Sequence, residues 1–271
     1  MPGFKSVMDI FKLLEKTNCR QCDEKTCLAF ASAVFKGARP LADCPRVPAE
    51  IASLHGGRPA ERSVQELEIE QQMAELREKV TRIDFASAAA RIAADYDGRR
   101  LVLKIMGKDF AVDADGKIQT DIHVNPWVTI PILNYILHCQ GAPLTGKWVP
   151  LRELPGGKDW YRLFGQRCEK PLKKVADSYP DLFADLVEVF SGEPVENHYQ
   201  SDVALVLRPL PLVPLLICYW RPDEGLESDL NLFFDANAEV NLGIGGIYAL
   251  GAGITRMFEK MALTHGGGGQ G

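Results

Sequence analysis

Apolar residues near the N-terminus recur at helical spacing. They are three or four positions apart, at Phe4, Val7, Met8, Phe11 and Leu14. This spacing predicts a short helix with one buried face. Segment 27–38 repeats the pattern, and Gly37 is placed to end it, because glycine is favoured just beyond a helix C-terminus.

The segment from Ser63 to Asp97 contains neither glycine nor proline and is rich in Glu, Gln, Ala and Arg. It predicts one long helix, or two helices joined near 81–84, with Ser63 as the N-cap. Its apolar stripe consists of Leu67, Met73, Leu76, Val80, Ile83 and Ala90. The stripe is too short for a sustained heptad repeat, so we expect it to pack on the domain that follows rather than in a coiled coil.

The rest of the chain predicts strands that are adjacent in sequence and helices that are grouped. We expect three strands in 100–124, a helix in 125–141, a loop in 141–160, two short helices in 171–192, two apolar strands in 202–220, a strand from 229 and a helix in 244–262. Strict strand–helix alternation and the glycine-rich and phosphate-loop motifs of nucleotide-binding folds are absent from the sequence. The pattern therefore favours an α+β fold over a doubly wound sheet.

The expected organisation is a small helical domain followed by a larger mixed α+β domain. Glycines and prolines between Leu54 and Ser63 indicate a linker. We therefore expect domains at 1–53 and 64–263, with the linker at 54–63 and a flexible glycine-rich tail at 264–271.

Composition and charge narrow the possible functions. Of the 271 residues, 46% are hydrophobic and 25% charged, and the net charge of −5 is not accompanied by a basic block. Such a chain is a poor candidate for binding nucleic acid or an anionic membrane. The best apolar run, 210–220, is interrupted by Pro211 and Pro214, so we expect no membrane insertion. The N-terminus lacks the apolar core of a signal peptide, which predicts a cytoplasmic protein.

Four of the seven cysteines lie in one short segment with the spacing Cys19-x2-Cys22-x4-Cys27-x16-Cys44. In a reducing compartment, clustered cysteines are more often metal ligands than disulfides. Cys27 is expected at the start of a helix, where free N–H groups and the helix dipole stabilise a thiolate. Pro45 follows the last cysteine and turns the chain away.

The spacing leaves a zinc ion and a [4Fe–4S] cluster open. Zinc sites with four cysteines favour two Cys-x2-Cys turns, and only one is present. Three cysteines on one loop-to-helix turn and a fourth from further along suit a cluster, whose corners need ligands on several sides. The spacing therefore favours the cluster, with a structural zinc site as the alternative.

The segment LLEKTNCRQCDEKTCLAFASAVFKGARPLADCP resembles the N-terminal [4Fe–4S] domain of the corrinoid iron–sulfur protein large subunit and of the B subunit of Rnf electron-transport complexes. The resemblance implies that Cys19, Cys22, Cys27 and Cys44 are the ligands of one [4Fe–4S] cluster. In that family the Cys-x2-Cys loop usually contains glycines, as in CGxCG. Here Arg20 and Asp23 take their places.

The region 84–262 resembles an uncharacterised domain of anaerobic bacteria and archaea that often follows this cluster domain. The resemblance lies in VNPWVTIPILNYILHCQGAPLTGKWVPLRELPGG, LPLVPLLICYWRPDE and LFFDA. It implies a domain boundary but no catalytic residue.

Other residues of the larger domain give weaker signals. The pattern of Asp113, Asp115 and Gly116 matches part of a calcium loop, but a plain turn is favoured because the other ligands are missing. Cys168 and Cys218 are expected to be core or half-buried thiols. Cys139 directly follows His138 on a predicted helix, where neighbouring side chains point apart and cannot easily share a metal. Acidic residues in 223–229 are expected to form a solvated turn rather than a ligand site. His123, His138 and His198 belong to no motif.

These patterns predict an electron-transfer protein rather than an enzyme, because no nucleophile–base motif is legible. We expect a one-electron carrier or reductive activator in anaerobic metabolism, whose redox partner protein could be a corrinoid protein. In the alternative, the larger domain binds a small molecule or a corrinoid, and the cluster reduces or tunes it.

Overall fold

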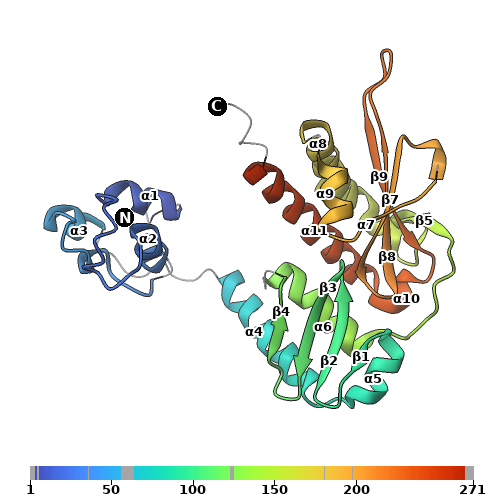
Figure 1. The fold of residues 1–271 in the computed structure, drawn as a ribbon, viewed down its shortest axis with the longest axis horizontal. Helices are drawn as coiled ribbons and strands as arrows, with labels where there is room; N and C mark the ends of the chain where they lie inside the picture. Colours follow the sequence, from blue (N-terminus) through green and yellow to red (C-terminus); the bar gives the residue numbers. More distant parts are fainter. Residues whose placement is uncertain are drawn as a thin grey trace. The chain divides into compact units, whose positions relative to one another are not determined.

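The computed structural model describes residue 4 and residues 6–35, 37–55, 64–122, 125–179, 181–196 and 198–265 (Figure 1). Contacts within the chain divide it into two compact units, Met1–Glu68 and Ile69–Gly271. Each unit has its own hydrophobic core. None of the described helices is both long enough and apolar enough to cross a membrane.

The first unit is helical. It contains α1 (Val7–Leu13), α2 (Cys27–Phe35), the short 3-10 helix η1 (Leu41–Asp43) and α3 (Ala49–His55). Ser6 begins α1 by accepting a hydrogen bond from the backbone N–H of Asp9. Helices α1 and α2 pack together over a small core that includes Ile10, Phe30 and Leu41. Most of the predicted apolar face of α1 packs on this core, but Met8 is exposed, and Ile10, which the predicted face left out, is fully buried.

The boundary between the units lies within α4 (Val64–Val80), whose first residues belong to the first unit. In the second unit, α5 (Phe85–Ile92) follows α4. The break lies at 81–84, the position predicted for two joined helices, and the side chain of Asp84 caps α5. An antiparallel four-stranded sheet follows, in the order β1–β2–β3–β4. Its strands are β1 (Asp95–Tyr96), β2 (Arg100–Ile105), β3 (Lys108–Asp113) and β4 (Ile118–Thr120).

A second antiparallel sheet has the strand order β5–β9–β8–β7–β6. Its strands are β5 (Trp148–Pro150), β6 (Glu193–Pro194), β7 (Val203–Leu210), β8 (Val213–Trp220) and β9 (Asp229–Asp235). Strand β8 is buried on both faces over most of its length. One face belongs to the main core, and the other to a smaller cluster around Leu216, Cys218 and Phe233.

Helices complete the second unit (Figure 1). They are α6 (Pro126–His138), α7 (Gly157–Phe164), α8 (Lys170–Ser178), α9 (Leu182–Glu188), α10 (Ala238–Leu242) and α11 (Ile244–His265), with the short helical turns η2 (Leu151–Glu153), η3 (Gly165–Glu169) and η4 (His198–Gln200). Helix α11 packs against α6, α7 and α8. The predicted α+β fold is confirmed, because the sheets are antiparallel and the helices are grouped.

Some elements differ from the sequence prediction. The predicted loop 141–160 contains β5 and the start of α7, because Val149 and Leu151 are buried in the core. The predicted loop after Cys44 contains α3, which also includes Leu54 and His55, two residues expected in the linker. The rest of that linker, 56–63, lies outside the described residues. Helix α11 extends to His265, and 266–271 also lie outside the described residues.

Candidate iron–sulfur site

The four clustered cysteines line one pocket in the first unit. Its apolar side is formed by Leu14 and Phe30, and its rim includes polar residues of the loop between α1 and α2. The thiols at 22, 27 and 44 are buried, whereas Cys19 is half-buried. The fold therefore brings together all four residues that the sequence singled out.

Helix α2 begins at Cys27, as predicted. The hydroxyl of Thr26 accepts a hydrogen bond from the backbone N–H of Ala29 at 3.0 Å, which caps the first turn. Asn18, in the preceding loop, forms two hydrogen bonds with Cys27. Its Oδ1 accepts from the Cys27 N–H at 2.8 Å, and its own N–H donates to the Cys27 Sγ at 3.3 Å. These two hydrogen bonds join the cysteine-bearing loop to the start of α2.

The loop carrying Cys19 and Cys22 has an unusual backbone. Lys16, Asn18, Arg20 and Asp23 all have positive φ, with φ of 62° at Arg20 and 58° at Asp23. This left-handed region favours glycine, because other side chains clash with the backbone there. The structure thus explains why glycine suits the positions that Arg20 and Asp23 occupy.

Arg39 forms hydrogen bonds to both the segment that carries Cys22 and the segment that carries Cys44. Its Nη1 donates to the backbone carbonyl of Cys22, and its Nε donates to the carboxylate of Asp43 at 2.9 Å. Asp43 directly precedes Cys44. The hydrogen bond to Asp43 raises the pKa of Arg39, so the guanidinium keeps its charge.

Arg46 forms a second connection at the half-buried edge of the pocket. Its Nη1 donates to Glu15 at 2.8 Å, and its Nε donates to the side-chain oxygen of Gln21 at 3.4 Å. The pKa of Cys19 is lowered, mainly by the backbone N–H of Gln21, while burial opposes the shift and the Thr17 hydroxyl and the Arg46 charge assist it. This environment favours the thiolate, which is the form that binds metal.

Sequence reasoning did not identify Asn18, Arg39 or Arg46 as parts of this site. The only available signals were the position of Asn18 beside the first cysteine and the i,i+4 spacing of Arg39 and Asp43.

Among the described residues, no three His, Cys, Asp or Glu side chains are grouped closely enough to surround a single metal ion.

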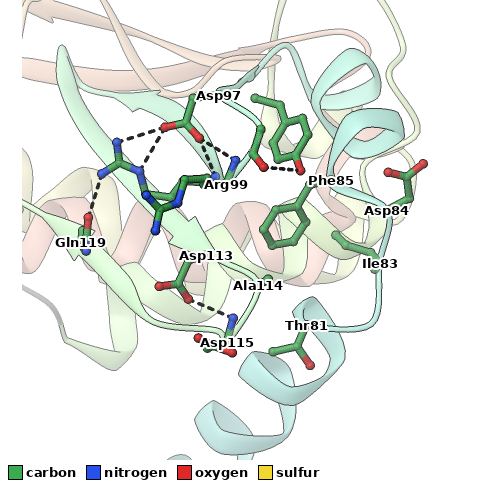
Figure 2. Close-up of a pocket in the computed structure, with 13 residues that line it drawn as sticks. Thr81, Ile83, Asp84, Phe85, Asp97, Arg99, Asp113, Ala114, Asp115 and Gln119 are labelled. Atoms are coloured by element: carbon green, nitrogen blue, oxygen red, sulfur yellow. Dashed lines mark hydrogen bonds and ion pairs between the residues drawn. The ribbon is translucent and has the colours of Figure 1, made fainter.

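The second unit has a polar hollow of about 710 Å³ at one end of its first sheet (Figure 2). It is formed by the α4–α5 connection, the turn between β1 and β2, and the turn after β3. Asp113 Oδ1 accepts from the backbone N–H groups of Asp115 and Lys117, so the segment forms the plain turn favoured from the sequence.

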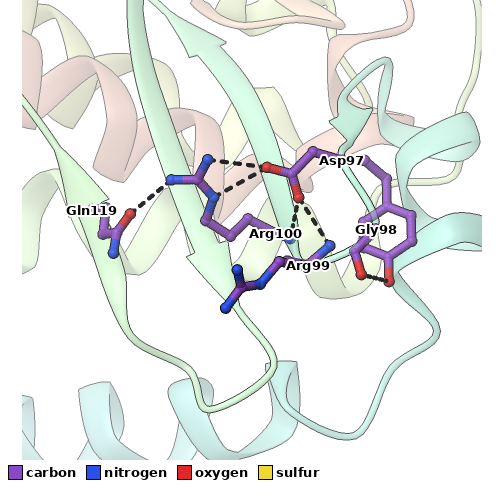
Figure 3. A network of polar contacts seen from close by, with 6 residues as sticks. Asp97, Gly98, Arg99, Arg100 and Gln119 are labelled. Atoms are coloured by element: carbon purple, nitrogen blue, oxygen red, sulfur yellow. Dashed lines mark hydrogen bonds and ion pairs between the residues drawn. The ribbon is translucent and has the colours of Figure 1, made fainter.

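Asp97 organises the neighbouring turn (Figure 3). Its Oδ1 accepts from the backbone N–H groups of Arg99 and Arg100, and its Oδ2 accepts two hydrogen bonds from the Arg100 guanidinium. Arg100 also donates to Gln119 on β4. Backbone hydrogen bonds from Arg100 and Arg99 lower the pKa of Asp97, so this network stabilises the turn with a charged carboxylate.

The remaining candidate residues lie apart from these sites. Cys168 and Cys218 are buried in the hydrophobic clusters, as expected, and Cys139 is buried there too. His198 lies in η4, and His138 at the end of α6. His123 lies outside the described residues. Residues 221–227 are exposed and fold back through a bridge between Asp223 and Leu226, which gives the solvated turn that was favoured.

A family model described as "Domain of unknown function (DUF3786)" matches residues 84–257, about two thirds of the chain. The chain belongs to this family. A second model, described as "Putative Fe-S cluster", matches residues 14–46 of this DUF3786 protein, a range that includes all four clustered cysteines.

Two similar proteins are described as acetyl-CoA decarbonylase/synthase complex subunit gamma. The Methanothermobacter thermautotrophicus protein is 43% identical over 42 residues, which are 16% of the DUF3786 chain and 9% of the relative. The Methanocaldococcus jannaschii protein is 44% identical over 45 residues, which are 17% and 9% of the two chains. The similarity therefore spans about a tenth of these relatives. No solved structure matches the chain. The match to the Fe-S cluster model and the similarity to these two relatives support the view that the chain is an iron–sulfur protein.

Proposed function

We propose that the first unit binds one [4Fe–4S] cluster through Cys19, Cys22, Cys27 and Cys44. The observation that carries the proposal is that all four thiols line one pocket. A cluster of this type is held by four cysteine thiolates. The match to the Fe-S family model over the same segment supports the assignment.

The surroundings of the thiols suit a negatively charged cluster. The Asn18 N–H points to Cys27 Sγ, and the pKa of Cys19 is lowered. The guanidinium of Arg46 contributes to that lowering and is held in place by Glu15. When bound, the cluster would supply one-electron redox chemistry, and these residues would orient it and balance its charge.

We further propose that the protein is a one-electron carrier or reductive activator in anaerobic metabolism, with a corrinoid protein as its possible redox partner. The family resemblance of the cluster segment supports this role. The two relatives are named as subunits of a complex, which supports a protein partner. Cys19 is the most exposed of the four proposed ligands, so electrons would pass most directly at its edge of the site.

The partner is proposed to dock on the exposed side chains of Arg20, Gln21 and Asp23. Contacts through such a polar patch are weak and sensitive to salt. Arg20→Glu should slow electron transfer from a reduced acidic ferredoxin, used as a probe, at low ionic strength but much less at high ionic strength. Stopped-flow absorbance of the cluster would measure the rate.

Lys12→Glu provides a matched control, because it makes the same change of charge on α1 at an exposed residue that does not line the pocket. Both variants should retain the iron content of the parent protein. Equal transfer rates for the parent and the Arg20→Glu variant at every salt concentration would refute docking at this loop. A cluster that cannot be reduced and reoxidised at all would refute the carrier role.

A further inference from the structure

The second unit contains an apolar cavity of about 220 Å³, distinct from the polar hollow in Figure 2. Its walls come from the β2–β3 hairpin, the segment after β4, the first turns of α6, the segment after α9, strand β7 and helix α11. Twelve of its fourteen lining residues are apolar. The two charged members, Lys108 and Asp121, are half-buried and exposed respectively, which places them at the solvent edge.

Close contacts between neighbouring segments stop the walls of the cavity from moving together. The hairpin is fixed to β7 by a hydrogen bond of 2.8 Å from the Met106 N–H to the Arg208 carbonyl. Gly107 has a φ of 79°, and a Cβ there would collide with the Ser191 side chain, so the hairpin lies directly against the segment after α9. These contacts prevent the hairpin from moving inward to fill the space.

Helices α6 and α11 are fixed by a second close approach. A Cβ on Gly253 would lie 2.8 Å from the Trp127 carbonyl oxygen, so the helices already touch at this point and cannot come closer. Arg256 of α11 also lies over the Trp127 ring, 4.1 Å from its centre. Since protein interiors normally pack densely, a hollow of this size between walls that are already in contact indicates space for another molecule.

Apolar side chains also lie at the solvent edge of the cavity, beside the two charged residues. Trp127 and Val189 line it and have 42% and 45% of their surface exposed. An engineered apolar cavity of about 150 Å³ binds benzene, so the present cavity can take a slightly larger molecule. We propose that it binds a small uncharged apolar ligand, about the size of a substituted benzene ring. This proposal does not depend on the cluster.

Toluene is a suitable probe for the full-length protein. Calorimetric titration should give one saturable site per chain, and toluene should raise the midpoint of thermal unfolding followed by tryptophan fluorescence. All four tryptophans belong to the second unit, so this signal reports the unit that holds the cavity.

Val128→Phe fills the cavity from α6 and should weaken toluene binding at least tenfold. Val187→Phe is the matched control, because Val187 is partly exposed and does not line the cavity. Met257→Phe fills the cavity from α11 and gives an independent test if the first variant does not fold.

No saturable binding of toluene to the parent protein would overturn the proposal. Equal binding by the folded filling variants and the control would also overturn it, because the ligand would then occupy another place. A loss confined to the filling variants is the expected result.

Discussion

Replacing Arg20 by glycine should stabilise the first unit, although it removes a long side chain next to a proposed cluster ligand. Arg20 has a φ of 62°, in the left-handed region. A non-glycine residue in this region costs about 1–2 kcal/mol of folding free energy. Glycine removes this strain but loses more backbone entropy on folding, which costs roughly 0.5–1 kcal/mol. The expected net gain lies between roughly 0 and 1.5 kcal/mol, with a central value of about 0.7 kcal/mol.

Lys25→Gly is the matched comparison in the same loop. Lys25 is exposed and has a negative φ, so glycine relieves no strain there and only adds the entropy cost. This variant should lose roughly 0.5–1 kcal/mol. With a urea dependence of about 1 kcal/mol per molar for a unit of this size, the unfolding midpoints of the two variants should differ by about 1 M or more.

The assay is anaerobic urea unfolding of the cluster-loaded protein, followed by loss of the visible cluster absorption. This signal reports the first unit, and the tryptophan fluorescence of the second unit serves as an internal reference. If both substitutions lower the midpoint by similar amounts, the backbone strain assigned to Arg20 is wrong. The same result would remove the structural explanation for glycine at this position in related cluster domains.

Three further predictions concern both units. Asn18→Ala should speed loss of the cluster more than Asn18→Gly. Both substitutions remove the side-chain hydrogen bond to the Cys27 N–H, but only alanine is strained at the φ of 49°. Equal rates of loss of the visible cluster absorption would contradict this. Burial alone would raise the pKa of Asp177, but hydrogen bonds led by that from Ser228 lower it overall. The resulting stabilisation is present above the unfolded pKa of about 3.9 and is lost as the pH falls through the folded pKa. Asp177→Asn should therefore lower the urea midpoint of the second unit at pH 7 more than at pH 3, and an equal loss at both would count against it. Burial raises the pKa of the three cysteine thiols of the second unit, so they should resist alkylation until it unfolds; rapid mass-detected labelling of the native protein would disprove their burial.

The sequence predicted the fold where the periodicity was strong. The break between α4 and α5 and the apolar strands β7 and β8 follow directly from patterns of buried positions. Strand β5 was missed because it has only three residues between glycine- and proline-rich stretches, and its pairing with β9 is a long-range contact. Such short edge strands are defined by their partners rather than by local sequence.

The sequence pointed to the four clustered cysteines of the candidate site but not to the residues that surround them. Cysteine spacing is a local signal, and it led directly to the four residues that line the pocket. The contact of Arg46 with Glu15 joins residues that are 31 positions apart, and no local pattern marks it. The left-handed backbone at Arg20 was hidden for a different reason, because arginine itself gives no sign of a positive φ.

Metal and sulfide analysis of anaerobically purified protein tests the central claim most directly. The account predicts about four irons and four acid-labile sulfides per chain, as a [4Fe–4S] cluster requires. Replacement of Cys22 and Cys44 by serine should lower both values together. One zinc ion per chain, with neither iron nor sulfide, would contradict the account and make the pocket a structural zinc site.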